Sequence, residues 1–158
     1  MRNSILKKIG LATIVGILIA IGIILYMFYK PHRDVQAAKI DYTLTTTEIV
    51  SQYLKDTDTA NNKYLSEEGK SKIIAITGKV FSITIDQNNQ KVIVLKSAND
   101  KAGVSCTFMK NTNNSATKLK KGETVTIKGV IRSGAGFDED LDMYEDVILE
   151  KCDVIINQ

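Results

Sequence analysis

The longest uncharged stretch of the chain runs from Ile9 to Tyr29. As an α-helix, these 21 residues are long enough to cross the roughly 30 Å hydrocarbon layer of a membrane. Tyr26, Phe28 and Tyr29 lie at its C-terminal end, where aromatic side chains favour the membrane interface. Pro31 then blocks continuation of the helix. We therefore expect a transmembrane helix over residues 9–29, which makes the lipid bilayer the first partner of the chain.

A cleaved signal peptide is the alternative interpretation of this stretch. Residues 35–37 (Val-Gln-Ala) have the small-residue character of a cleavage site. The apolar run is longer than the core of a signal peptide, however, and Lys30 and Arg33 separate it from that site. No cysteine follows the run closely, which excludes lipidation of a mature N-terminal cysteine. We expect the anchor to be permanent.

The charge distribution predicts the orientation of the anchor. Residues 1–33 carry five Lys or Arg and no acidic residue, whereas residues 34–158 have a net charge of −2. The basic tail, residues 1–8, favours the cytoplasmic side, although Lys30 and Arg33 make the preference slim. We therefore expect a single-pass protein of the inner (cytoplasmic) membrane, with its C-terminal domain outside the cytoplasm. A domain without excess positive charge also disfavours nucleic-acid binding.

Ala12, Gly16 and Ala20 lie four residues apart and share one helix face. Small residues at this spacing let two membrane helices pack closely, which would give an anchor-mediated homodimer. Gly and Ala are also frequent in membrane helices that do not pair. The sequence leaves both interpretations open.

The rest of the chain has the pattern of a small β domain. Residues 30–44 are expected to form a juxtamembrane stem, and residues 45–158 a helix followed by a barrel. Thr45 and Glu48 have the spacing of a capping box, which begins an amphipathic helix that reaches about residue 65. The alternation of apolar residues changes phase next to Gly78, which predicts a bulge and a bend in the first strand. The five predicted strands cover residues 72–85, 91–96, 104–109, 124–132 and 146–156.

One helix and five strands with a bent first strand fit a mainly β fold, a five-stranded barrel of the OB type. Six segments resemble the bacterial tRNA anticodon-binding-like (tRNA_anti-like) OB-fold family of uncharacterised membrane proteins and lipoproteins. They are residues 42–45, 63–65, 76–80, 104–108, 121–129 and 147–152. The resemblance implies the fold and no active site. Two features depart from the family, namely a helix in place of a lipidated cysteine and Val130-Ile131 where many members have a further cysteine.

Cys106 and Cys152 are the only cysteines. Each has the parity of the apolar residues in its strand, so both are expected to point into the barrel. The third and fifth strands of an OB barrel are neighbours, so the two thiols either form a disulfide or pack as two small apolar groups. An oxidising compartment favours the disulfide.

The segment from Asp138 to Asp146 contains six acidic residues. Asp138, Asp140 and Asp142 match the start of an EF-hand loop, but Met143 and Leu149 replace the glycine and the glutamate that the loop requires. We interpret the segment as a solvated loop and predict no metal site. Calcium binding or a metal-dependent hydrolase built on these acids is the weaker alternative.

Few residues suggest catalysis or nucleic-acid binding. The single histidine, His32, lies at the membrane boundary, far along the chain from both cysteines. Phe108 is the only aromatic residue of the second and third strands, and its parity points to the core. The basic cluster at Lys118, Lys120 and Lys121 fits a solvated turn. Residues 113–115 match the pattern of a glycosylation site, and we interpret this match as chance.

We therefore predict a non-enzymatic binding or scaffolding module with no catalytic residues and no cofactor. Its expected ligand is a protein, a peptide or a glycan outside the cytoplasm. The alternative is a single-stranded nucleic-acid-binding OB domain, which would need a cytoplasmic location and a basic groove.

Overall fold

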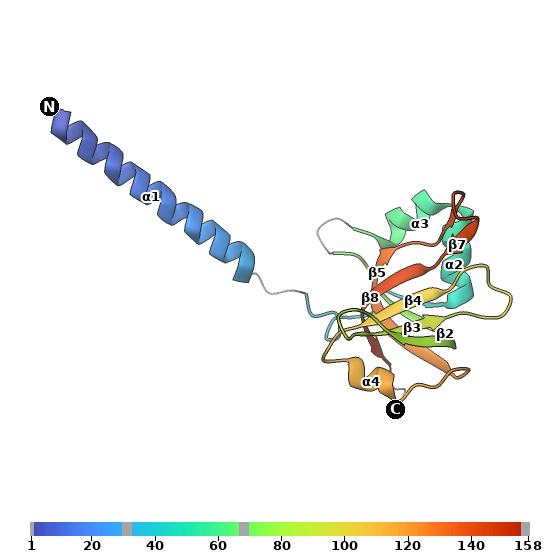
Figure 1. The fold of residues 1–158 in the computed structure, drawn as a ribbon. Helices are drawn as coiled ribbons and strands as arrows, with labels where there is room; N and C mark the ends of the chain where they lie inside the picture. Colours follow the sequence, from blue (N-terminus) through green and yellow to red (C-terminus); the bar gives the residue numbers. More distant parts are fainter. Residues whose placement is uncertain (1, 30–32, 67–69, 156–158) are drawn as a thin grey trace. The chain divides into compact units, whose positions relative to one another are not determined.

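The computed structural model describes residues 2–29, 33–66 and 70–155, with side chains from residue 13 onward (Figure 1). The chain divides into two compact units, residues 1–33 and residues 34–158. Each unit is described by itself below. The predictions made for the tail of residues 1–8, for Ala12 and for His32 concern side chains outside the described residues.

The first unit contains one long helix, α1, from Arg2 to Tyr29. Every described side chain of α1, from Thr13 to Tyr29, is exposed, and the large apolar ones include Ile14, Leu18 and Phe28. Among the residues whose side chains are described, no helix combines the length and the apolar character needed to cross a membrane. The membrane span over residues 9–29 and its homodimer stay predictions.

The second unit is a closed β-barrel, as the sequence predicts. Neighbouring strands follow the order β2-β3-β4-β8-β5, and antiparallel pairing of β5 with β2 closes the barrel. Among these five barrel strands, all pairs are antiparallel except β4 with β8. The barrel strands are β2 (Ile73–Ile85), β3 (Lys91–Leu95), β4 (Val104–Phe108), β5 (Thr124–Ser133) and β8 (Val147–Val154).

Strand β2 is long because its two halves have different neighbours. The first half lies between β5 and a short parallel strand, β1 (Tyr42–Thr45), whereas the second half pairs with β3. The register shifts between Val80 and Ser82, so the predicted bulge lies at Phe81, a few residues beyond Gly78. Gly78 has a different role, because it leaves room for a neighbouring side chain. A Cβ atom at this position would overlap the side chain of Thr46, the first residue of the helix that follows β1.

The expected single helix is two helices, α2 (Thr46–Lys55) and α3 (Thr57–Tyr64). The predicted capping box begins α2, with the Thr45 backbone donating to Glu48 Oε2 at 2.7 Å and Glu48 N donating to Thr45 Oγ1 at 3.2 Å. Asp56 has an extended backbone and ends α2. Its carboxylate accepts a hydrogen bond from Thr59 N at 3.0 Å, so the same residue caps the start of α3.

Residues 34–44, which the sequence analysis assigns to a stem, belong to the folded unit. The side chain of Lys128 is 9% exposed and donates hydrogen bonds to the carbonyl oxygens of Gln36 at 2.8 Å and Ala38 at 2.5 Å. Asp41 Oδ2 accepts from Ile73 N at 2.8 Å, which fixes the segment to the start of β2. These bonds depend on long-range contacts, which explains why the sequence pattern did not reveal them.

Three short elements complete the unit, α4 (Asn113–Thr117), β6 (Gly136–Asp138) and β7 (Met143–Glu145). The Asn113 side chain accepts from Lys91 N and donates to the Asn89 carbonyl, both at 2.9 Å, so the amide of the glycosylation-like segment ties α4 to the turn before β3. The core combines barrel side chains with residues of α2 and α3. Its largest fully buried side chains are Tyr53, Tyr64, Phe108, Ile49, Ile74, Ile76, Ile93, Leu95, Ile127 and Leu149.

Candidate ligand-binding surfaces

The outer face of β2, β3 and β4 is the face that OB domains use for ligands. Cross-strand pairing aligns six outward side chains in two rows that contain no charge and no ring. The first row holds Ser82, Val94 and Ser105, and the second holds Thr84, Val92 and Thr107. Ile93 and Cys106 between the rows are fully buried. The face therefore offers hydroxyl and methyl groups, which suit hydrogen bonding and apolar contact rather than base stacking.

One exposed ring does lie on β2, and the sequence analysis did not single it out. Phe81 is 52% exposed at the bulge, and Lys121 Nζ lies 5.4 Å from the centre of its ring. The bulge shifts Phe81 out of the inward-facing register. The phase change in the apolar pattern was the signal that could have identified it. Phe108, in contrast, is fully buried as predicted.

The acidic segment between β5 and β8 is ordered into a hairpin of β6 and β7. Phe137 pairs with Tyr144, and their rings are 4.9 Å apart between centres. The turn is closed by Asp138 Oδ1, which accepts hydrogen bonds from the backbone of Asp140 at 2.9 Å and of Leu141 at 3.0 Å. Phe137, Leu141 and Met143 are each about half exposed or more, at 48%, 67% and 52%. The predicted solvated loop is therefore a structured hairpin that displays apolar side chains among acids.

The predicted absence of a metal site concerns the same hairpin. Among the described residues, no group of three or more His, Cys, Asp or Glu side chains is placed to hold a metal ion. One carboxylate oxygen of Asp138 is already used within the turn. At the base of the hairpin, Asp146 Oδ1 accepts from Gly103 N at 2.6 Å, which ties that acid to the barrel.

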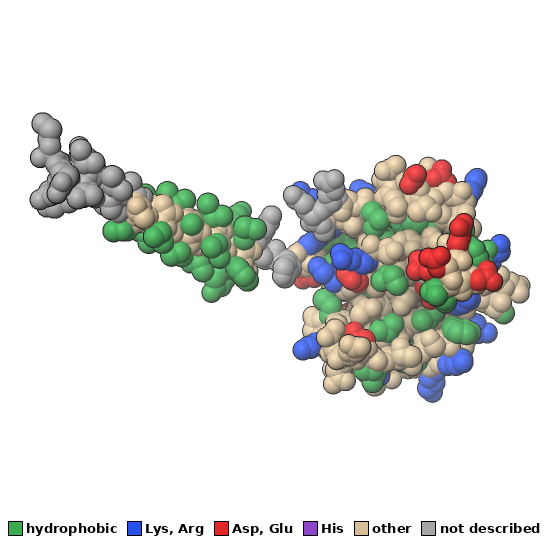
Figure 2. Space-filling model, turned by 45° about the horizontal axis from the view of Figure 1, so that its top comes forward, with side chains coloured by type: hydrophobic (Ala, Val, Ile, Leu, Met, Phe, Trp, Pro, Cys, Tyr) green, Lys and Arg blue, Asp and Glu red, His purple; other side chains and the backbone are tan. Residues whose placement is uncertain are grey.

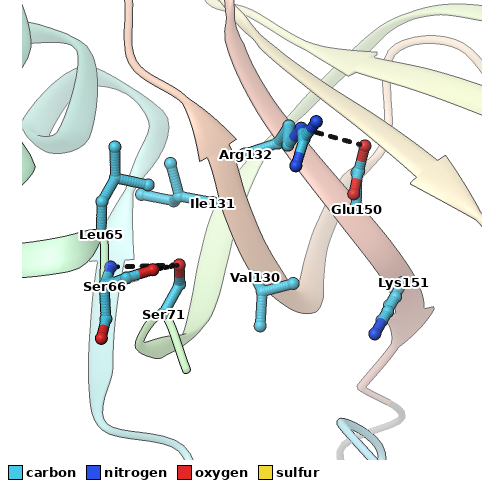
Figure 3. A pocket seen from close by; sticks show the side chains of 8 residues that line it. All are labelled: Leu65, Ser66, Ser71, Val130, Ile131, Arg132, Glu150 and Lys151. Carbon is cyan, nitrogen blue, oxygen red and sulfur yellow. Dashed lines mark hydrogen bonds and ion pairs between the residues drawn. The ribbon is translucent and has the colours of Figure 1, made fainter. Parts of the chain in front are cut away.

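A cleft of about 360 Å³ lies between β5, β8 and the segments on either side of residues 67–69 (Figure 3). Leu65, Val130 and Ile131 contribute its apolar part, and Arg132 and Glu150 approach each other at its rim, with Nε and Oε1 3.9 Å apart. Both charged side chains are well exposed, so this long ion pair contributes little to stability. Because the lining carries both charges, the cleft does not favour a ligand of one sign.

Lys151 is the third charged residue that lines this cleft, and it lies at a bulge in β8. The pairing of β8 with β5 shifts between Glu150 and Asp153, and Lys151 there has a φ of 55°. Gln36 Nε2 donates a hydrogen bond to the Lys151 carbonyl at 2.5 Å. The unusual backbone at Lys151 therefore belongs to the attachment of residues 34–41 to the barrel.

Cys106 and Cys152 lie on the neighbouring strands β4 and β8, and both side chains are fully buried. The two thiols are free in the structure, and burial together with a hydrogen bond to Cys106 raises the pKa of Cys152 well above its usual value. A thiol held in its protonated form is a poor nucleophile, which fits a structural rather than a redox-catalytic role. The disulfide stays a prediction.

The fold defines the class of this protein. A closed five-stranded barrel with strand order 1-2-3-5-4 and a bent first strand is an OB fold. The chain belongs to the tRNA_anti-like family, whose model matches residues 1–140. No curated protein matches the chain.

A solved structure supports the fold at low sequence identity. A crystal structure described as a candidate nucleic acid-binding lipoprotein of Klebsiella pneumoniae is 13% identical, with a TM-score of 0.53, and the match covers 80% of this chain and 100% of that one. Asparaginyl-tRNA synthetase of Entamoeba histolytica is 18% identical, with a TM-score of 0.38 and coverage of 60% and 23%. At 13% identity the likeness to the Klebsiella structure concerns the fold alone.

Proposed function

We propose that this protein is an OB-fold binding or scaffolding module, attached to the inner membrane through residues 9–29, that recognises a protein, a peptide or a glycan outside the cytoplasm. The observation that carries the proposal is the hairpin of β6 and β7, where Phe137, Leu141 and Met143 are exposed to solvent. Apolar side chains gathered on the surface of a folded domain mark an interaction site more often than a structural need. The acids around them disfavour a phosphate backbone as the ligand.

Two observations support membrane attachment. Residues 9–29 carry no charge, and the described side chains of α1 are exposed and largely apolar. An exposed helix of this composition would be unstable in water, whereas lipid would cover its side chains. The basic residues before residue 9 support a cytoplasmic N-terminus, which leaves the folded unit on the other side.

The absence of catalysis is part of the proposal. The two thiols, the strongest nucleophiles of the described residues, are buried in the core, where they cannot reach a substrate. The two rows of side chains on the outer face of β2, β3 and β4 carry hydroxyl and methyl groups and no titratable group. A surface of this kind holds a ligand without activating it.

Single-stranded nucleic-acid binding is the second candidate function. The pairing of Phe81 with Lys121 favours it, because an exposed ring beside a cation is an element of a stacking surface. The hairpin argues against it, since its acids lie in the loop between the fourth and fifth barrel strands that helps frame the OB ligand site.

A reporter fused to the C-terminus separates the two candidates. We expect an enzyme that is active only outside the cytoplasm to be active in this fusion. The same fusion lacking residues 2–29 is the control and should be inactive, because nothing would direct it across the membrane. Activity of a cytoplasm-specific reporter in the full-length fusion would contradict the proposal and favour the nucleic-acid alternative.

A further inference from the structure

The hairpin of β6 and β7 presents a preformed surface rather than a mobile loop. Two backbone groups donate to Asp138 Oδ1 in the turn, and Tyr144 packs against Phe137 across the strands. Lys101 Nζ lies 5.2 Å from the centre of the Tyr144 ring, which links the hairpin to the segment before β4. Because these contacts already fix the backbone, a partner would bind without a large cost in ordering it.

The apolar residues at the hairpin are only partly covered by the described part of the chain. Leu141 is 67% exposed at the turn, and Met143 and Phe137 are about half exposed on the strands. On the right of the folded unit, the side on which Figure 1 draws β7, Figure 2 shows hydrophobic side chains beside gathered Asp and Glu. The register pairs Phe137 with Tyr144 and Met143 with Asp138, so Phe137 and Met143 lie on opposite faces of the hairpin. The apolar centre is therefore Leu141 at the turn together with Met143, which shares its face with Asp138 and Glu145. Neighbouring exposed apolar residues among acids are typical of a contact surface.

The charge around these apolar residues selects the partner. Asp138, Glu139, Asp140, Asp142 and Glu145 belong to the hairpin, and none of them lies within ion-pair distance of a Lys or Arg among the described residues. Unpaired acids around an apolar centre are complementary to a segment that combines basic and apolar side chains. They would repel an anionic lipid surface or a nucleic acid.

We propose that this hairpin is the docking surface for a cationic polypeptide segment, whose apolar side chains contact Leu141 and Met143 while its Lys or Arg side chains pair with the surrounding acids. This inference rests on the proposed binding function and names the partner class and the surface. The apolar contacts give the affinity, and the acids give the preference for positive charge and a dependence on salt.

The test measures binding of a short amphipathic Lys/Leu peptide to the full-length protein in nanodiscs of zwitterionic lipid, with empty nanodiscs as the reference. Replacing Leu141 and Met143 with Ser should weaken binding at least about fivefold, as expected for central apolar contacts. The combination Asp140→Asn and Asp142→Asn should weaken it to a similar degree, and Asn tolerates the φ of 51° at position 142. Added salt should weaken binding by the unaltered protein and have less effect on the Asn variant.

Matched control variants carry the same changes elsewhere. Ile85 is 59% exposed at the end of β2, and Ile85→Ser should leave the affinity unchanged. The pair Asp58→Asn and Glu150→Gln removes the same charge outside the hairpin and should likewise have no effect. We expect all variants to have the same melting temperature, which would show that the hairpin changes do not unfold the domain.

Three results would overturn the inference. They are unchanged affinity in both hairpin variants, equally tight binding of a peptide with Glu in place of Lys, and no binding of the Lys/Leu peptide at all. Each leaves the proposed membrane location intact, because the C-terminal reporter tests that separately. A cytoplasmic reporter signal with hairpin-dependent peptide binding would instead overturn the location and keep the docking surface.

Discussion

Replacing Tyr53 with Ala is expected to destabilise the folded unit by about 4 kcal/mol, within the range measured for loss of a large buried side chain. Tyr53 is fully buried and lies between the barrel and α3, with its ring centre 6.2 Å from that of Tyr64. Its ring also lies directly on the backbone of Gly134, where an added Cβ atom would overlap it. Removing the ring would therefore open a cavity between α2 and the segment that leads into the hairpin.

The conservative change Tyr53→Phe should behave differently. The Tyr53 hydroxyl is buried without a hydrogen-bond partner among the described residues, and burial raises the pKa of Tyr53 to about 12. Removing an unpaired polar group while keeping the ring should leave stability unchanged or raise it by about 1 kcal/mol. Urea unfolding of residues 34–158 measures both changes, and equal losses for Ala and Phe would show that the hydroxyl is essential.

Oxidation of Cys106 and Cys152 to a disulfide should stabilise the unit by about 4 kcal/mol, as the chain-entropy relation gives for a loop of roughly 46 residues. The two thiols lose two protons and two electrons, which a disulfide of a thiol oxidoreductase outside the cytoplasm accepts. The strands β4 and β8 are adjacent and the two thiols interact, but Cys152 is paired with Phe108, two residues along β4 from Cys106, so forming the bond requires a local adjustment of the two strands.

Protein recovered from outside the cytoplasm should then melt at a lower temperature after reduction. The variant Cys106→Ala provides the control, because its melting temperature should not respond to the reductant. Intact-mass measurement of the purified protein identifies the bond directly, since oxidation removes two hydrogen atoms. Two free thiols in protein from that compartment would contradict the prediction and leave the pair as buried apolar groups.

The barrel was predictable because apolar and polar residues alternate along each strand. Val125, Ile127 and Ile131 alternate with polar residues along β5, and Val104, Cys106 and Phe108 do the same in β4. The start of α2 was predictable for the same reason, because Thr45 and Glu48 form their capping box locally. Local patterns of this kind carry their information within a few residues.

The remaining features depend on partners distant in sequence. Lys128 is an ordinary basic residue in the sequence, and only the fold brings it to the carbonyl groups of Gln36 and Ala38. The exposure of Phe81 follows from a register shift between β2 and β3. In the acidic segment, the high charge concealed the apolar residues, and pairing of Phe137 with Tyr144 was needed to show a hairpin.

The claim on which the proposed function rests most is that lipid covers α1 and holds the binding domain at a membrane. Extraction of isolated membranes at alkaline pH tests it directly. We expect the uncleaved full-length protein to stay in the membrane pellet and a variant without residues 2–29 to be soluble. Uncleaved full-length protein in the supernatant would contradict the account.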